Sequence, residues 1–538
     1  MKKHVIKRAK RWVKFKIIIL LALTVIAVGI IFAKSPEGDT AFLSANDRSR
    51  WCTVASLVEH GTYVIDDVIS IRDPNNSGRR PWDTIDKVQH RGPTGTVHFY
   101  SSKPPLFPTM VAGVYWVINK CTGLKITDHP ILIPKIILLL VNLPLYGIFL
   151  WSMASVIDHL CRTSWAKYTA MIATSFCTML LPFSISLGNH LPAAASIAVA
   201  TALYFYAAEI LDDEYGVWKS VHPLVYFLAG IAIAFGVANE LPALAMAVLF
   251  VGLFFLLERS SAVPIFLGAS LVAFLFFGTN WIAHQSLRPA YAHRGNGMKV
   301  GKFIKTTDST ISNDQKLEDL SEQLEVHLRE VSRLGKEQSI QLSHSDESER
   351  WRITAASRDY ALLDKGGHWE MRLWDDWYEY PGSYWQDGRR RGVDLGEPSR
   401  WAYLFHITIG HHGIFSLTPL FFLIPFGIVR LVLFGPADLM RFSIAVSIAS
   451  IVCVAFYVMR PLIDRNYGGV SSYFRWVLWF MPLWIPMVAV TLDDWSQYRW
   501  FRVLAIVLIA ISTASMSTAL ANPWQSPWLY DLWQDWTG

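Results

Sequence analysis

Long apolar blocks constrain what this chain can fold into more than any other feature of its sequence. They occur near 17–33, 131–157, 165–187, 190–208, 221–237, 241–257, 262–282, 413–434, 438–458, 472–492 and 501–520. A helix needs roughly 20 apolar residues to cross a bilayer. With 52% hydrophobic and only 17% charged residues, the 538-residue chain is unlike a soluble protein. The sequence therefore predicts an all-α polytopic membrane protein with about 11 transmembrane helices.

A strongly basic segment precedes the first of these spans. Its charged residues, with no acidic residue among them, are Lys2, Lys3, Lys7, Arg8, Lys10, Arg11, Lys14 and Lys16. Basic residues beside a span favour its cytoplasmic end, so we expect a cytoplasmic N-terminus rather than a nucleic-acid-binding tail. No small-residue cleavage site cleanly follows 17–33, which indicates a retained span rather than a signal peptide.

The block Phe107–Asn119 decides the topology, because it is too short to cross and has a proline near its start. We expect it to lie as an interfacial or re-entrant helix on the outer face of an inner (cytoplasmic) membrane. The chain then divides into a transmembrane catalytic module at 1–282, an extracytoplasmic insert at 283–412 and a C-terminal transmembrane region at 413–538. This topology also leaves open a disulfide between Cys52 and Cys121 on the outer side.

The stretch from Ser44 to Pro108 carries two charges of special interest, Asp47 and Lys103. It reads SANDRSRWCTVASLVEHGTYVIDD, then a polar connection, then VHFYSSKPPLFP. A carboxylate at a membrane surface can act as a base or a metal ligand, and an ammonium can bind a phosphate. The pair indicates chemistry on a lipid-linked phosphate, unless both are ordinary loop charges. For that chemistry we expect Asp47 and Lys103 within about 10 Å of each other, in one outer cavity that also contains His190.

Two similar segments, NHLPAAAS at 189–196 and NELPALAM at 239–246, begin later spans. Asn is a good N-cap and Pro suits the first helical turn, so both segments are explained as helix starts. That explanation does not account for His190 and Glu240, which are ionisable groups at a membrane boundary. Asn189, His190 and Glu240 are therefore candidate substrate-binding residues.

The segment MRPLIDRNYGGVSSYFRW at 459–476 places arginines around a pair of glycines. Guanidinium groups suit phosphate oxygens, and glycine lets the backbone approach a ligand closely. Arginines that extend to the membrane interface are the alternative explanation. The candidate phosphate-binding residues here are Arg460, Arg465 and Arg475.

The 283–412 segment is too long for a connector, which predicts a small extracytoplasmic domain or lid. Its first half has a helical apolar stripe formed by Leu317, Leu320, Leu324, Leu328, Val331 and Leu334. The aromatic run HWEMRLWDDWYEYPGSYW at 368–385 is typical either of an interfacial belt or of a surface that stacks on sugars. His406, His411 and His412 follow, and a His pair can ligate a metal, but adjacent histidines without a third ligand in view are weak evidence for a metal site.

The order of these features resembles the GT-C superfamily of integral-membrane glycosyltransferases, and within it the lipid A aminoarabinose transferases and the protein O-mannosyltransferases. The likeness rests on the early acid, the helix RSRWCTVASLVEHGTYV and YSSKPPLFP, and it is best over about 40–260. It implies that Asp47 activates the acceptor or holds a metal and that Lys103 meets the donor phosphate. The chain departs from the family at His190, where a second acid often stands, and at Glu240, where relatives often have a basic residue.

The resemblance implies a GT-C glycosyltransferase of the cell envelope, with a polyprenyl-phosphate-linked sugar as donor and membrane lipids as surroundings. Asp47 would be the base, and a divalent metal ion, if one is used, would have Asp47 and His190 as its candidate ligands. The alternative is a transporter or flippase for lipid-linked glycans, which should show pseudo-symmetric halves and charges deep in its spans. We favour the enzyme because the charges gather at helix ends. The sequence does not identify the sugar or the acceptor, whether lipid, glycan or protein.

Overall fold

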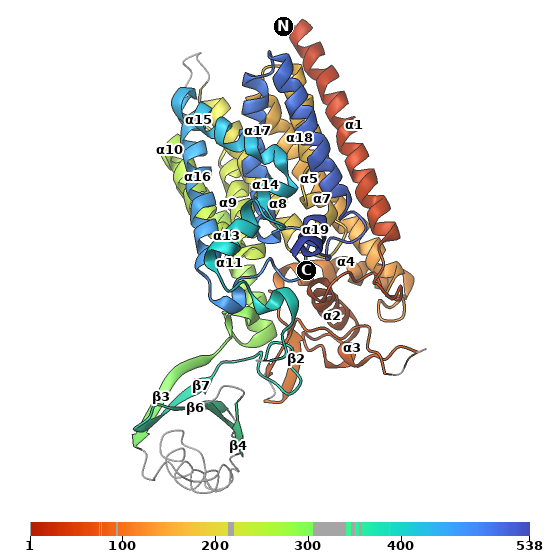
Figure 1. The fold of residues 1–538 in the computed structure, drawn as a ribbon, viewed down its shortest axis with the longest axis vertical. Coiled ribbons are helices and arrows are strands. Elements are labelled where there is room, and N and C mark those ends of the chain that lie inside the picture. The colour runs from red at the N-terminus through yellow and green to blue at the C-terminus, as the bar shows by residue number, and fades with distance from the viewer. Residues whose placement is uncertain are drawn as a thin grey trace.

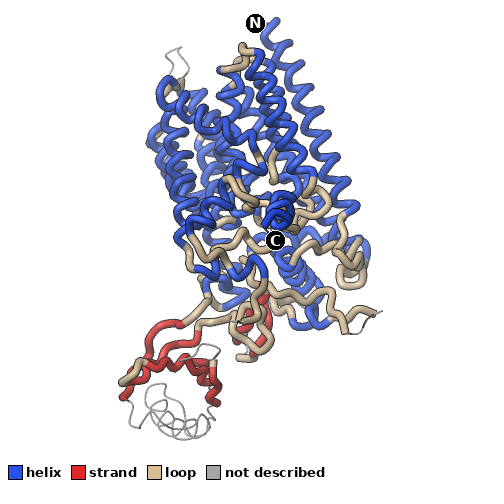
Figure 2. Tube along the Cα trace, viewed as in Figure 1, coloured by secondary structure: helices blue, strands red, loops and turns tan. Residues whose placement is uncertain are grey.

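The computed structural model describes residues 2–74, 76, 78–92, 95–212, 220–304, 341–345, 350–354, 358–386 and 388–537. Helices dominate these residues (Figure 2). Within the described ranges, seven helices are long and apolar enough to cross a membrane: Val13–Phe32, Leu132–Leu160, His190–Leu211, Arg259–His284, Ala437–Met459, Arg475–Asp494 and Arg499–Ser517. Three shorter apolar helices are Pro223–Asn239, Leu241–Leu257 and Pro419–Phe434. The prediction of a helical membrane protein is confirmed.

The apolar helices pack side by side into one bundle (Figure 1). Its helices are α1 (Lys2–Phe32), α5 (Leu132–Leu160), α6 (Ser164–Phe176), α8 (His190–Leu211), α9 (Pro223–Asn239), α10 (Leu244–Leu257), α11 (Ala262–His284), α15 (Ile424–Phe434), α16 (Ala437–Met459), α17 (Met481–Asp494) and α18 (Arg499–Ser517). Glycine allows α9 and α11 to touch closely, since a Cβ on Gly230 would lie 2.2 Å from the Ile265 carbonyl oxygen. Small residues commonly serve this purpose between membrane helices.

The expected span at 165–187 is interrupted. It consists of α6, which ends at Phe176, and the one-turn helix α7 (Leu180–Phe183). Pro182 explains the break, because a proline inside a continuous helix lacks the N–H and collides with the carbonyl of the residue four positions earlier. In place of about 11 expected spans, the described residues contain seven helices long enough to cross a membrane and three shorter apolar helices. The short block Phe107–Asn119 lies within α4 (Leu106–Thr122), which is neither one of the seven long helices nor one of the three shorter ones.

The all-α expectation is wrong in one respect, because the described residues include two antiparallel sheets. Strands β1 (Lys87–Arg91) and β2 (Val97–Ser101) form a hairpin in which Lys87 is opposite Ser101. The second sheet has the order β3-β7-β6-β5-β4, with strands Asn296–Ile304, His368–Trp374, Asp359–Asp364, Arg350–Thr354 and Gln341–His344. Its small apolar core consists of Ile353, Tyr360, Leu362 and Met371. Ile353 and Met371 stand between polar neighbours, as in a sheet with one packed face, whereas β6 is buried continuously from Tyr360 to Leu363.

The aromatic run 368–385 forms β7 and then returns to the hairpin. The Trp377 ring stacks between His90 of β1 and His293, at centroid distances of 4.0 and 3.5 Å. The Gln89 N–H donates to the Trp377 carbonyl at 2.8 Å. These contacts attach the segment that carries the five-stranded sheet to the hairpin beside the bundle. The leucine stripe predicted over Leu317–Leu334 lies outside the described residues.

The start of α1 lies at one end of the bundle, and both sheets lie at the other (Figure 1). Beside the sheets are α2 (Ala45–Glu59), α3 (Asp66–Ser70) and α4. The remaining short helices are α13 (Arg400–Thr408), α14 (Ile414–Leu417) and the C-terminal α19 (Trp528–Thr537). Cys52 and Cys121 are both free, and the Cys52 thiol donates to the Trp82 carbonyl at 3.2 Å, so they do not form the disulfide that the sequence left open.

Candidate anion-binding site

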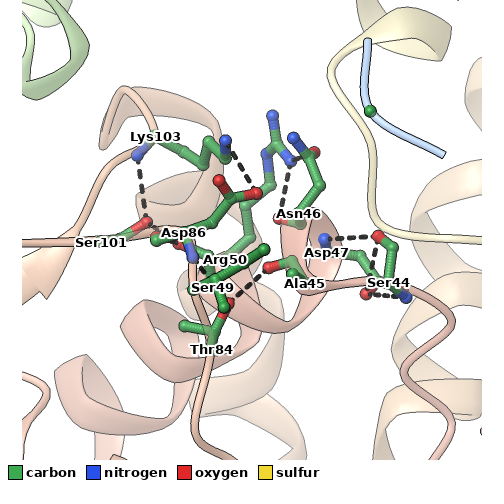
Figure 3. Close-up of polar contacts among 12 residues, drawn as sticks. Ser44, Ala45, Asn46, Asp47, Ser49, Arg50, Thr84, Asp86, Ser101 and Lys103 are labelled. Atoms are coloured by element: carbon green, nitrogen blue, oxygen red, sulfur yellow. Dashed lines mark hydrogen bonds and ion pairs between the residues drawn. The ribbon is translucent and has the colours of Figure 1, made fainter. Parts of the chain in front are cut away.

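Asp47 lies in the first turn of α2 and forms a capping box with Ser44 (Figure 3). Its carboxylate accepts the Ser44 N–H at 2.9 Å and the Leu43 N–H at 3.0 Å. In return, the Asp47 N–H donates to Ser44 Oγ at 3.1 Å. A capping box satisfies backbone donors that a helix start leaves free. The fully buried Asp47 carboxylate therefore holds the start of α2 in place.

Lys103 forms its ion pair with Asp86 rather than with Asp47 (Figure 3). The Lys103 Nζ lies 3.0 Å from Asp86 Oδ2. Lys103 lies two residues after the end of β2 and Asp86 directly precedes β1, so the hairpin brings them together. The Asp86 carbonyl accepts Ser49 Oγ of α2 at 2.5 Å and the Ser102 N–H at 3.1 Å. These bonds fix the Asp86 backbone between α2 and the hairpin.

Arg50 is buried one turn after the start of α2 and extends to the helix ends of the bundle. Its guanidinium donates to the Asn46 carbonyl at 3.0 Å and to Asn189 Oδ1 at 2.7 Å. The Asn189 amide in turn donates to Glu240 Oε1 at 2.7 Å and to the Asn239 carbonyl at 3.0 Å. The two N-x-L-P segments therefore meet, and Arg50 binds to their junction.

His190 and Arg475 complete the network. His190 Nδ1 lies 2.5 Å from Glu240 Oε1, and Arg475 Nη1 lies 2.8 Å from His190 Nε2. Because arginine only donates, His190 Nε2 accepts and its Nδ1–H donates to Glu240. Arg475 Nε also donates to the Gly468 carbonyl at 2.6 Å. Gly468 has φ +97°, and a Cβ there would lie 2.4 Å from Arg475 Nε, so glycine is required where the loop wraps the guanidinium.

The electrostatics show that Lys103, Arg50 and Asp86 share one site with Arg475. Burial and the neighbouring Arg475 together lower the pKa of Arg50 to about 10, against the opposing effect of Asp86. Burial, with the smaller effects of Arg50 and Arg475, lowers the pKa of Lys103 to about 8, and Asp86 opposes this shift. Burial raises the pKa of Asp47 to about 6, although its bonds to backbone N–H groups act in the other direction. Three cations therefore crowd together in a dry environment.

Four of the residues predicted from the sequence meet in this network: Asn189, His190, Glu240 and Arg475. Lys103 lies next to it, through its interactions with Arg50 and Arg475. The two other arginines of the 459–476 segment have different partners. Arg460 pairs with Asp464 at 2.8 Å, and Arg465 donates to the Pro398 carbonyl at 3.0 Å.

Sequence reasoning missed Arg50 and Asp86. A signal for Arg50 exists in the spacing of Asn46 and Arg50, which puts an amide and a guanidinium on one face of a helix. Asp86 has no comparable signal, because it lies in a polar connection among other acids and depends on the hairpin for its position.

The residues around Asp47 and His190 do not fit a divalent metal ion. Both Asp47 oxygens accept backbone N–H groups, and both His190 ring nitrogens are hydrogen-bonded. Two guanidinium groups close by would also repel a cation. We derive no step through a metal at this site.

An anion fits the same place much better. Among the described residues, neither Arg50 nor Arg475 forms an ion pair with a carboxylate, and their hydrogen-bond partners are neutral groups. Asp86 and Glu240 offset the charge of Arg50 only from a distance, and burying a charge that no carboxylate contacts is costly. Two such charges next to the Lys103 ammonium therefore provide a site for a phosphate-like anion, which guanidinium groups bind through paired N–H donors.

Comparisons with known proteins found solved structures of low similarity to this chain. No family model and no curated protein sequence matches the chain. The oligosaccharyltransferase of Archaeoglobus fulgidus in complex with Zn and sulfate is 12% identical over 95% of this chain and 53% of that chain, with a TM-score of 0.46. Its apo form is 10% identical over 95% of this chain and 56% of that chain, with a TM-score of 0.45. The archaeal oligosaccharyltransferase AglB from Archaeoglobus fulgidus, in complex with an inhibitory peptide and a dolichol-phosphate, is 11% identical over 95% of this chain and 56% of that chain, with a TM-score of 0.42.

The chain spans about half the length of the solved structures that it matches. It is a helical membrane protein with a buried, cation-rich polar site at one end of its bundle.

Proposed function

We propose that this protein is a GT-C-type glycosyltransferase that moves a sugar from a polyprenyl-phosphate donor to a hydroxyl acceptor on the extracytoplasmic face. The observation that carries the proposal is the pair of buried guanidinium groups, Arg50 and Arg475, without carboxylate partners beside Lys103. The phosphate of a lipid-linked donor supplies the missing anion. The site lies at the end of the bundle opposite the start of α1, whose basic residues favour the cytoplasm.

In this mechanism the donor phosphate binds the Lys103 ammonium in place of Asp86 and also binds the Arg50 and Arg475 guanidinium groups. Asp86 is then released from its ion pair and can accept the proton of the acceptor hydroxyl. The acceptor oxygen forms a bond to the anomeric carbon while the bond from that carbon to the phosphate oxygen breaks. The lipid phosphate leaves with the electron pair, and the three cations stabilise its charge. Attack opposite the leaving group inverts the anomeric centre.

The base expected to be Asp47 is thus assigned to Asp86 in the proposal. The Asp47 carboxylate already accepts two backbone hydrogen bonds, whereas the Asp86 carboxylate contacts Lys103. Asp47 contributes by fixing the first turn of α2, from which Asn46 and Arg50 extend into the site. His190 and Glu240 position Arg475 and Asn189.

The proposal is tested by comparing lipid extracts of cells with and without the protein. Loss of the transferase should cause a polyprenyl-phosphate sugar to accumulate and a glycosylated envelope component to disappear. Wild-type protein should reverse both changes, and an Asp86→Asn variant of equal abundance should reverse neither. If purified protein in vesicles moves the donor across the bilayer and leaves the sugar–phosphate bond intact, the protein is a flippase and the proposal is wrong.

A further inference from the structure

A second cluster of ionisable side chains lies outside the site described above. It consists of Glu397, which precedes α13, His406 within α13 and His411 in the following turn. One potential ligand atom from each residue lies within 4.8 Å of the others. Ligands of a tetrahedral zinc ion lie roughly 3.4 Å apart, given bond lengths near 2.1 Å. Side-chain rotations that bring the three atoms closer by up to about 1.4 Å would therefore let all three bind one ion.

The groups behind these three residues are arranged as the outer shell of a metal site usually is. The His411 and His412 rings are hydrogen-bonded through their Nδ1 atoms, so His411 can donate there and keep its Nε2 lone pair free. The Tyr467 hydroxyl donates to Glu397 Oε1 at 2.8 Å, which orients the carboxylate and leaves Oε2 available. The Tyr467 ring stacks on His412 at a centroid distance of 3.8 Å.

The inner groups still have capacity for a ligand. Within the described part of the chain, His406 Nδ1 has no hydrogen-bond partner, and no lysine or arginine pairs with Glu397. The His406 and His411 rings are stacked at 3.9 Å, so both present their edges to the same space. A metal ion would satisfy the carboxylate and both imidazoles at once. Tyr530 and Trp533 of α19 pack against the cluster and limit the access of water.

The backbone around the cluster leads to Arg475. The Glu397 N–H donates to the Arg465 carbonyl at 2.8 Å, and the Phe474 N–H donates to the His412 carbonyl at 3.2 Å. The intervening loop carries the Gly468 carbonyl that holds Arg475. An ion that joins Glu397 to the two histidines would therefore fix the loop that positions Arg475.

We propose that Glu397, His406 and His411 bind one zinc ion, which stabilises the loop beside the anion site. Two imidazoles and one carboxylate are a common zinc ligand set. The three residues would leave the fourth position of the ion to a water molecule. The ion would act on the loop and not on the transfer step, because the cluster shares no residue with the proposed catalytic site. The inference stands on this cluster alone and does not depend on glycosyl transfer.

The test measures metal content in detergent-purified protein that carries no polyhistidine tag. After exposure to equal trace concentrations of zinc, iron, cobalt and manganese, the wild type should retain one zinc ion per protein molecule, measured by inductively coupled plasma mass spectrometry. His406→Gln, His411→Gln and Glu397→Gln should each lose it. The exposed His129 provides the matched control, and His129→Gln should keep the full equivalent.

A second measurement covers the case in which a variant fails to fold. Wild-type protein stripped with a chelator should melt at a lower temperature than untreated protein, and added zinc should restore the original melting temperature. Zinc retained by all three variants, zinc lost equally from His129→Gln, or wild type that holds iron or no metal would each overturn the proposal. So would an unchanged melting temperature after the metal has been removed.

Discussion

Replacing Arg475 by alanine should weaken the binding of a polyprenyl phosphate strongly. The side chain donates to His190 Nε2 and to the Gly468 carbonyl, and its guanidinium lies 4.9 Å from the Trp524 ring centroid. None of these partners is an acid, so the charge is available to an anion. A hydrogen bond to a charged group contributes about 1.5–3 kcal/mol. We therefore expect the dissociation constant to rise roughly 10- to 150-fold, at about 1.4 kcal/mol per tenfold change.

The assay is a titration of nanodisc-embedded protein with undecaprenyl phosphate. Arg441, which is exposed on α16, supplies a matched arginine, and Arg441→Ala should bind like the wild type. The double variant Arg50→Ala/Arg475→Ala should bind less tightly than either single variant, but by less than the sum of the two effects, because both cations contact one phosphate. If Arg475→Ala is folded, shown by an unchanged elution profile and melting temperature, and binds as tightly as the wild type, the anion-site argument fails.

Four further outcomes follow from the geometry. Affinity for undecaprenyl phosphate should fall as the pH rises through about 8, because burial lowers the pKa of Lys103 and the side chain loses its proton there. The affinity of the Lys103→Arg variant should stay nearly constant over the same pH range, because arginine remains protonated. Asp86→Asn should lower the transfer rate about 10²- to 10⁴-fold while the folded protein still binds the lipid phosphate, as expected for loss of a general base. Asp47→Ala should lower the stability by about 0.5–2 kcal/mol, measured as a lower melting temperature. Asp47→Asn should keep most of the transfer activity, and loss of that activity from folded protein would identify Asp47 as the base.

Much of the architecture could be predicted because it follows from composition and local pattern. Apolar blocks long enough to cross a bilayer predicted the helical bundle, because backbone groups in lipid must form their hydrogen bonds within the helix. The two N-x-L-P segments identified Asn189, His190 and Glu240, because ionisable groups at such boundaries need a polar partner. The structure shows that these partners are each other and the two arginines.

The errors have equally physical causes. Counting apolar residues treated 165–187 as one span, although Pro182 ends the hydrogen-bond ladder and starts a separate turn. The sheet formed by strands within 296–374 was missed, because its strands are short and β6, buried from Tyr360 to Leu363, shows no alternation of apolar and polar residues. Strand pairing joins residues that are distant in sequence, so short runs within a long loop were not recognised as one sheet.

The ion pair between Lys103 and Asp86 is the reason that we propose Asp86, rather than Asp47, as the base. Both acids lie near the same helix, but the start of α2 needs an acceptor in its first turn, and Asp47 stands where a capping box supplies one. Both oxygens of the Asp47 carboxylate already accept backbone hydrogen bonds, which leaves little room for contact with an acceptor hydroxyl. Hydrogen bonds to the backbone carbonyl of Asp86 fix the position of this residue in the fold. Its carboxylate is therefore free to pair with the Lys103 ammonium. An anion that takes Lys103 then leaves Asp86 as the carboxylate available to act as a base.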